Sequence, residues 1–222
     1  MLRKSILRGN PLVKQTKIAI VGVGGRGCHA LRKFGNVAKN CSLIAMDTEA
    51  KSLGKLPKKI NKLLIGRDML KGAGASNPKM AEHAAMADSK KIEEKLLGHD
   101  VVLLIVGLGG ATGTGAGHII GQVAKNNLNC LIFAFATWPF RMEKGNFAKA
   151  EEWDQDLVNS STFTFRIYND RLLYINPKAT PKEAFDLADR VLRDAIMNFV
   201  GTFETLDFLH PEQRGVLGES EN

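Results

Sequence analysis

Two glycine-rich loops contain the residues of this sequence best suited to hold an anion. The first, at residues 22–27, reads GVGGRG and lies between a short β-branched run and a segment of helical character. Glycines at such a turn let the backbone approach a phosphate, and the following helix offers free N–H groups with a partial positive charge. Asp47 closes the next apolar run, where a dinucleotide-binding protein places its ribose-binding carboxylate. This loop alone therefore fits either a nicotinamide-dependent oxidoreductase or a tight turn between packed elements.

The second loop, at residues 107–115, reads GLGGATGTG and follows the most apolar run of the chain. Successive backbone N–H groups in such a loop form an anion-binding concavity, and the hydroxyls of Thr112 and Thr114 add donors. The Gly-Lys-Ser/Thr ending of a Walker loop is missing. A dehydrogenase has no general need for a second phosphate cradle, so the pair of loops favours a ligand with a longer phosphate chain.

The elements that must position these loops alternate along the chain. Runs rich in β-branched and apolar residues predict strands at residues 17–22, 42–47, 62–65, 100–107, 129–137 and 161–168. Helices are predicted at residues 27–39, 78–97, 114–126, 143–158 and 181–200. This alternation predicts an α/β fold, a Rossmann-like and mostly parallel sheet with helices on both faces.

The helix at residues 181–200 has the clearest periodicity, with an apolar stripe suited to pack on the sheet. Thr180 is its predicted N-cap, Pro181 takes the first helical position, and Glu183 lies three residues after the cap. From Gly201 onward we expect an irregular chain with an acidic, polar end.

Composition sets the broad class of the protein. The 222 residues suit one domain, or one domain with a tail, and 44% hydrophobic residues are enough for a folded core. Lys and Arg exceed Asp and Glu by 31 to 23, for a formal charge of +8. A basic surface favours anionic partners such as nucleotides or acidic lipid headgroups, or is simply a solvated surface. Aromatic residues are not interleaved with basic ones, so specific nucleic-acid binding is not predicted.

Cysteine usage indicates a reducing, cytoplasmic compartment. Cys28, Cys41 and Cys130 are far apart and form no C-x-x-C pair. The five histidines have no metal-ligand spacing either, so no protein-bound zinc is expected. No apolar run approaches the roughly 18 residues of a membrane-spanning helix. The basic arm at residues 1–16 is expected to be loose, or to touch a membrane surface.

A series of segments, in one order along the chain, resembles the FtsZ/tubulin superfamily. Residues 109–115 (GGATGTG) resemble its signature GGGTGTG, and residues 22–31 (GVGGRGCHAL) resemble its first loop, GVGGGGGNAV. The other matches are AMDTEA at 45–50, GAGASNP at 72–78, TWPFRME at 137–143, NDRLL at 169–173 and AFDLADRVL at 184–192. Together they cover about residues 17–200, so the chain resembles a divergent FtsZ-like protein of which only the GTPase domain is present.

The resemblance implies a site for GTP or GDP with Mg²⁺. The first loop would hold the diphosphate and the second would wrap the α- and β-phosphates, while Asp47, Thr48 and residues 72–76 would border the γ-phosphate and its Mg²⁺. The nucleotide-binding residues so implied are Gly24, Gly25, Arg26, Gly27, Asp47, Thr48, Gly74, Gly109, Gly110, Ala111, Thr112, Gly113, Thr114, Gly115, Pro139, Glu143, Asn169, Phe185 and Asp189.

The resemblance also assigns the nucleoside end of the ligand. Glu143 would bind the ribose, Asn169 and Asp189 would read guanine, and Phe185 would stack on the base. An amide or carboxylate can accept hydrogen bonds from guanine N1–H and N2–H₂ while rejecting the different edge of adenine. A carboxylate on a nearly apolar helix face, such as Asp189, also needs a partner.

Three positions depart from the family pattern. Arg26 replaces a glycine of the first loop, where it would crowd the phosphates or add a cation to them. His29 replaces an asparagine, and Phe147 falls near the position of an arginine that follows the ribose-binding Glu. Each change is expected to alter affinity for GTP.

Catalysis in the family depends on a loop that enters the site of the neighbouring subunit. The nearest match here is TLDFLH at residues 205–210, in which Asp207 keeps a carboxylate while Thr205 and His210 replace the family's Asn and second Asp. Asp207 is therefore the candidate catalytic residue, acting in trans by positioning water.

These observations define the expected organisation and function. We expect a basic arm at 1–16, a GTP-binding domain at 17–200 with its long central helix at 181–200, and an irregular tail at 201–222, without the family's second domain. The expected function is that of a prokaryotic, cytoplasmic, FtsZ-like GTP-binding protein of the cytoskeleton or of cell division. It would hydrolyse GTP weakly or not at all alone and self-associate head to tail. The alternatives are an interaction or regulatory module that has lost nucleotide, or an NAD-dependent oxidoreductase.

Overall fold

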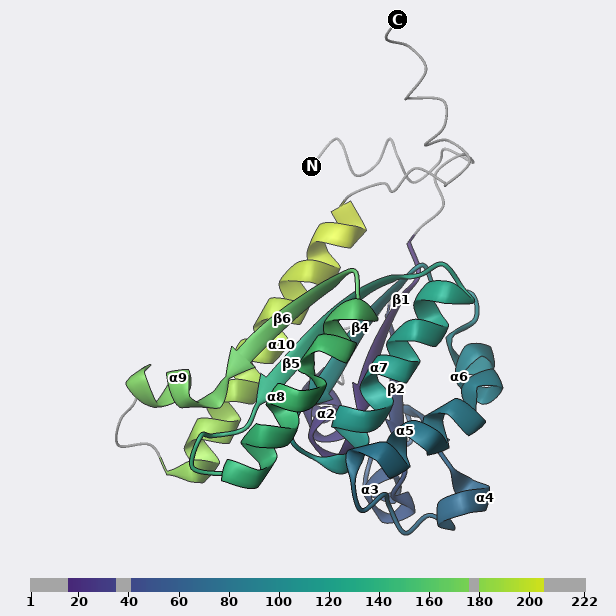
Figure 1. The fold of residues 1–222 in the computed structure, drawn as a ribbon. Coiled ribbons are helices and arrows are strands. Elements are labelled where there is room, and N and C mark those ends of the chain that lie inside the picture. The colour runs from purple at the N-terminus through teal and green to yellow at the C-terminus, as the bar shows by residue number, and fades with distance from the viewer. Residues whose placement is uncertain (1–15, 35–40, 176–179, 206–222) are drawn as a thin grey trace, which may run out of the picture.

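One parallel sheet organises the protein (Figure 1). The structure, a computed structural model, describes residues 16–34, 41–175 and 180–205. Six strands lie in the order β3-β2-β1-β4-β5-β6, and every pairing is parallel. The strands are β1 (Ile18–Val23), β2 (Cys41–Asp47), β3 (Asn61–Leu64), β4 (Val101–Gly107), β5 (Leu131–Trp138) and β6 (Phe163–Tyr168). The predicted α/β fold is confirmed, with each predicted strand present within two residues of its expected ends.

Helices cover both faces of the sheet, as expected (Figure 1). They are α2 (Gly24–Leu31), the 3₁₀-helix η1 (Arg32–Phe34), α3 (Ala50–Gly54), α4 (Arg67–Leu70), α5 (Pro78–Ala87), α6 (Ser89–Leu96), α7 (Ala111–Asn126), α8 (Lys144–Asn159), α9 (Asn169–Ile175) and α10 (Pro181–Thr205). The short helices α3, α4 and α9 were not predicted, because so few residues show no periodicity.

Two hydrophobic cores fill the space between the sheet and its helices. Alternation along β1 divides them, since Ala19 and Val21 belong to the core under α5, α6, α7 and α8. Ile18 and Ile20 belong to the opposite core, under α2, η1, α3 and α10. Every residue of β1 and β4 is buried, which explains why these strands read as continuous apolar runs.

Several helix boundaries differ from the sequence prediction. The helices α2 and α7 start at Gly24 and Ala111, three residues before their expected starts at 27 and 114, so part of each glycine loop is the first turn of a helix. The single helix expected at 78–97 is two helices that meet at Asp88, whose carboxylate accepts the N–H of Gly66 at 2.7 Å and the ammonium of Lys91 at 2.6 Å. Its side chain ties this junction to the loop after β3. The last helix continues to Thr205, where an irregular chain was expected from Gly201. Its start is as predicted, because Thr180 and Glu183 form a reciprocal capping box.

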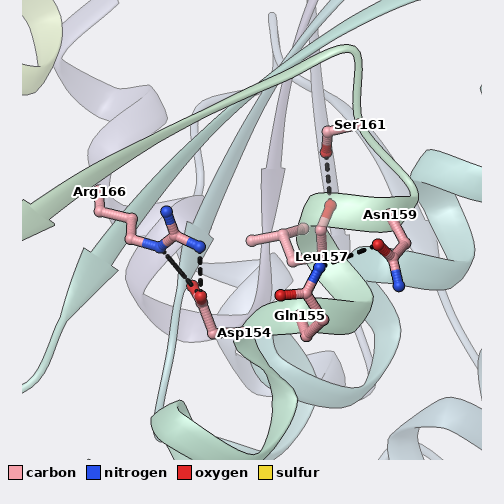
Figure 2. Close-up of polar contacts among 6 residues, drawn as sticks. All are labelled: Asp154, Gln155, Leu157, Asn159, Ser161 and Arg166. Atoms are coloured by element: carbon pink, nitrogen blue, oxygen red, sulfur yellow. Dashed lines mark hydrogen bonds and ion pairs between the residues drawn. The ribbon is translucent and has the colours of Figure 1, made fainter.

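Polar contacts attach α8 to the edge strand β6 (Figure 2). The guanidinium of Arg166 on β6 donates to the carboxylate of Asp154 on α8, with Nε 2.9 Å from Oδ2. At the end of the helix, the hydroxyl of Ser161 donates to the carbonyl of Leu157 at 2.8 Å. These contacts hold α8 beside the strand whose end leads into α9.

The strand register brings separate loops to one edge of the sheet. Val23 pairs with Met46 on one side and Val106 on the other, and farther along the edge Trp138 pairs with Tyr168. The carboxyl ends of these strands therefore meet, as in other open α/β sheets, whose ligands bind at this edge.

Candidate functional site

A cavity of about 510 Å³ opens at the carboxyl edge of the sheet. Both glycine loops, the loop between α4 and α5, the start of α8 and the start of α10 contribute to its wall. It is lined by Val23, Gly24, Gly25, Arg26, Asp47, Glu49, Ala73, Gly74, Ala75, Gly107, Leu108, Gly110, Ala111, Thr112, Gly113, Thr137, Pro139, Glu143, Asn146, Asn169 and Phe185.

The two glycine loops touch each other at the floor of this cavity. Gly24 has φ +68°, and a Cβ there would lie 2.6 Å from the backbone nitrogen of Gly113. Only glycine allows both the conformation and the contact. By contrast, a Cβ at Gly25 or Gly110 would meet no atom within 4 Å. The backbone at these two positions is therefore accessible to a ligand.

The beginnings of α2 and α7 both face the cavity. Gly24, Gly25 and Arg26 line it from α2, and Ala111, Thr112 and Gly113 line it from α7. The first N–H groups of a helix have no partner within the helix and carry a partial positive charge. Neither helix has an acidic residue in its first turn. Two helix N-termini thus converge on one cavity, an arrangement suited to several negative charges.

Several predicted residues shape the loops without lining the cavity. The N–H of Gly109 donates to the hydroxyl of Thr114 at 2.8 Å, which closes the second loop. A Cβ at Gly115 would lie 1.8 Å from the carbonyl oxygen of Pro78, and one at Gly27 would lie 2.4 Å from that of Ile105. These glycines permit close packing of α7 on α5 and of α2 on β4.

A chain of hydroxyl groups links the second loop to β2. The hydroxyls of Thr48 and Thr112 lie 2.7 Å apart, and the N–H of Ala75 donates to Thr48 at 2.9 Å. Asp47 is 2% exposed, and its Oδ1 accepts the N–H of Thr48 at 2.8 Å. Burial raises the pKa of Asp47, while hydrogen bonds from the backbone and from the Thr112 hydroxyl lower it less strongly. Thr48 therefore supports the cavity from behind rather than lining it.

The side chain of Glu143, which lines the cavity just before α8, is held by two hydrogen bonds. Its carboxylate accepts the N–H of Phe140 at 3.1 Å and the amide of Asn146 at 3.0 Å. Sequence reasoning placed Phe147 near the position of the family's arginine, but Phe147 packs on the ring of Trp138 at 5.5 Å, and its neighbour Asn146 lines the cavity. Neighbouring residues of a helix point about 100° apart, so only one of these two faces the site.

Buried polar groups lie at or next to the far end of the cavity, where Asn169 belongs to the lining and Asp189 does not. Asn169 is 4% exposed, and no described residue hydrogen-bonds to its Oδ1. Asp189 is 3% exposed, and Arg26 Nη2 lies 3.1 Å from its Oδ1. The Arg26 guanidinium also lies over the ring of Phe185, 4.7 Å from its centroid. We expected Arg26 at the phosphates, but its guanidinium lies at the end where base-reading residues were predicted.

Comparison with known proteins identifies the family. The family model "Tubulin/FtsZ family, GTPase domain" matches residues 17–177. The chain is 38% identical over 190 residues to "Cell division protein FtsZ 1" of Pyrococcus abyssi, covering 83% of this chain and 50% of that protein. A solved structure, "FtsZ dimer, empty (M. jannaschii)", has a TM-score of 0.83 at 31% identity and covers 92% of this chain and 60% of that one. This chain belongs to the Tubulin/FtsZ family.

The match covers the GTPase domain of this family. "Cell division protein FtsZ" of Aquifex aeolicus is 38% identical over 188 residues, 83% of this chain and 51% of that protein. The chain therefore spans about half the length of these FtsZ relatives, which are named as cell division proteins. The resemblance inferred from the glycine loops and the later segments is confirmed.

Some expectations for a Tubulin/FtsZ protein fall outside the described residues. Asp207, the candidate residue for catalysis in trans, lies there, as do residues 1–15 of the basic arm. Among the described residues, none of the helices is long and apolar enough to cross a membrane. In the same part of the chain, no group of three or more His, Cys, Asp or Glu side chains could hold a metal ion.

The sequence analysis missed three polar residues that line the cavity, Glu49, Thr137 and Asn146. Glu49 pairs with Ala73 in an isolated antiparallel bridge, which brings the loop before α5 against the segment after β2. The signal for Glu49 was its place within the segment AMDTEA, already matched to the family. Nothing in the sequence indicated Asn146, because its neighbour Phe147 was placed at the position of the family's arginine.

Proposed function

We propose that this chain is a GTP-binding domain of the FtsZ type, with the nucleotide in the cavity at the carboxyl edge of the sheet. The observation that carries the proposal is the convergence of two glycine loops, each opening a helix, on one cavity of about 510 Å³. That volume lies in the usual range for small-molecule sites, about 300–1,000 Å³. The cavity has one anion-binding end and one end with buried polar side chains, as a nucleotide requires.

The glycine loops suit the phosphate chain. Backbone at Gly25 and Gly110 is open to the cavity, and the first N–H groups of α2 and α7 would donate to phosphate oxygens. Asp47 and Gly74 border the same region and would lie near the γ-phosphate. A Mg²⁺ ion there would be held chiefly by phosphate oxygens and water, so it requires no cluster of protein ligands.

The nucleoside would extend toward α9 and α10. Glu143 would accept hydrogen bonds from the ribose, and its carboxylate is already oriented by Asn146. Asn169 and Asp189 would read the N1–H and N2–H₂ edge of guanine, with Phe185 against the base. No described residue hydrogen-bonds to the Oδ1 of Asn169, and this supports the assignment, since a buried acceptor is costly unless a ligand satisfies it.

Hydrolysis would depend on a neighbouring subunit. Phosphoryl transfer needs positioning of water and stabilisation of charge, and Asp207 would supply the positioning group in trans. We propose that this chain alone hydrolyses GTP weakly or not at all, and that subunits associate head to tail. In the cell it would act in the cytoplasm of a prokaryote, in cell division or the cytoskeleton, with the basic arm available to a membrane surface.

Isothermal titration with GTP, GDP, ATP and NAD tests the proposal, with a charge-matched pair of variants. Gly110 precedes α7 in an extended conformation, where Asn and Asp are equally good N-caps. Gly110→Asp would put a carboxylate against the phosphates and lower affinity for GDP at least about tenfold, since like charges in such a site cost upward of 1.4 kcal/mol. Gly110→Asn would retain most of the affinity. Equal binding by both variants would refute this phosphate site, and NAD binding without guanine nucleotide would favour the oxidoreductase.

A second candidate function is an interaction module that keeps the fold without nucleotide. The contact of Arg26 with Asp189 and Phe185 favours it, because Asp189 then already has an ion-pair partner and Phe185 has a cation over its ring. Chromatography of the small molecules released on denaturing purified protein separates the two, since co-purified GDP excludes the module.

A further inference from the structure

The Arg26 side chain occupies the base-reading end of the cavity. Its Nη2 lies 3.1 Å from Asp189 Oδ1 and 3.4 Å from the carbonyl oxygen of Phe185, to which it donates. Its Cζ lies 4.7 Å from the centre of the Phe185 ring. Asp189 itself does not line the cavity, whereas Arg26 does. Arg26 and Phe185 therefore belong to the cavity wall, and the Asp189 carboxylate that Arg26 contacts does not.

This contact is an ion pair in which no described residue hydrogen-bonds to Asp189 Oδ1, and it uses the groups that would recognise guanine. A guanidinium is a planar, delocalised group with N–H donors along its edge that match a carboxylate, and its face stacks on aromatic rings. Guanine presents N1–H and N2–H₂ from one planar edge in the same manner. Both groups would use the carboxylate of Asp189 and the face of Phe185, so they cannot bind there together.

The buried carboxylate of Asp189 stabilises Arg26 in this position. Asp189 is 3% exposed, and an ionised carboxylate at such depth needs a compensating charge. The other cationic candidate, His29, has its Nε2 at 3.8 Å from Asp189 Oδ2 and is half exposed. Arg26 is thus the principal partner of Asp189 among the described residues.

We propose that Arg26 is an internal competitor of the guanine base, which the nucleotide must displace to reach Asp189 and Phe185. This inference rests on the proposed function. It adds that Arg26 sets the affinity of the site for guanine nucleotides and the selectivity of the site for the base. If Arg26 occupies the position in about nine molecules of ten, the apparent Kd for a guanine nucleotide is about tenfold higher than that of the open site. A ligand without a base gains nothing from its removal.

The test compares GDP, ADP and inorganic pyrophosphate as titrants of wild-type protein and Arg26→Ala. We expect Arg26→Ala to bind GDP about tenfold more tightly, with pyrophosphate and ADP affinities changed less than about twofold. The control Arg32→Ala removes an exposed arginine just beyond α2, outside the cavity, and should leave all three affinities unchanged. If Arg26 instead served the phosphates, Arg26→Ala would weaken GDP and pyrophosphate binding together, and the inference would be overturned.

A second measurement shows that the variant folds and that the pairing exists without ligand. Arg26→Ala leaves the buried Asp189 carboxylate without its main partner, so its melting temperature without nucleotide should fall, and adding Asp189→Asn should restore it. No fall in melting temperature would contradict the pairing. If wild-type protein binds GDP and Arg26→Ala binds it no more tightly, the inference alone fails; if neither binds GDP, the proposed function fails as well.

Discussion

The hydroxyl pair that joins the second glycine loop to β2 makes a quantitative prediction for Thr112→Val. Thr48 is fully buried, and its oxygen already accepts the N–H of Ala75 at 2.9 Å. An ionised carboxylate can only accept, so the hydrogen bond between Thr112 and Asp47 uses the Thr112 proton. The Thr48 proton then goes to the Thr112 oxygen, 2.7 Å away. Valine has the shape of threonine without the hydroxyl, so the substitution removes these two hydrogen bonds and leaves the volume unchanged.

The cost follows from the groups left behind. A buried hydroxyl without an acceptor, and a carboxylate that loses a donor, destabilise the fold by about 1–3 kcal/mol. For a protein of this size, each kcal/mol lowers the melting temperature by roughly 2–4 °C, so a loss near 2 kcal/mol means about 4–8 °C. Thermal unfolding followed by circular dichroism, without nucleotide, measures this difference.

The effect should depend on pH. Burial raises the pKa of Asp47 in the folded protein above its unfolded value, so the stability contributed by this group is full below the unfolded pKa and is lost as pH rises through the folded pKa. Without the Thr112 hydroxyl the pKa of Asp47 in the folded protein rises further. The free energy of unfolding therefore falls by a larger amount as the pH rises from below the unfolded pKa to above the folded one. The variant should therefore lie closer to wild type at about pH 4 than at about pH 7.

A matched threonine provides the control. The hydroxyl oxygen of Thr164 on β6 is also buried, but no described residue hydrogen-bonds to it. Thr164→Val should leave the melting temperature unchanged or raise it. An unchanged melting temperature for Thr112→Val at neutral pH, or an equal drop at both pH values, would refute this account of the hydroxyl chain.

Three further predictions test packing, an ion pair and thiol chemistry. Gly115→Ala would place a Cβ 1.8 Å from the carbonyl oxygen at the start of α5, so α7 must shift and denaturant unfolding should show a loss of about 1–3 kcal/mol; wild-type stability would contradict the packing. Asp154→Asn should weaken the contact with Arg166 by no more than about 1 kcal/mol, and 1 M salt, with a Debye length of about 3 Å, should reduce that difference; a difference insensitive to salt would argue against an ion pair. Burial raises the pKa of the Cys28 thiol, whereas the Cys41 side chain is half buried. Mass mapping after brief alkylation should therefore find Cys41 modified first. If Cys28 is modified before Cys41, the surroundings of Cys28 open in solution and the prediction is wrong.

The positions of the phosphate-facing loops could be inferred from the sequence, and the physical reason is local. A strand buried on both faces must be continuously apolar, and a loop that turns sharply into a helix must contain glycine, so β1 and β4 and the loops after them were visible in the residues. Parallel pairing then places both loops at one edge of the sheet. The capping box of α10 was equally local, since Thr180 and Glu183 are three residues apart.

The tertiary structure decided which residues face the cavity and which support it. Thr114 and Gly115 lie within the same loop as Thr112, yet one closes the loop and the other packs on α5. The pairing of Arg26 with Asp189 joins α2 to α10, and nothing near either residue in the sequence specifies it. A side chain's partner depends on where two distant elements meet, whereas a turn or a buried strand is specified by its own residues.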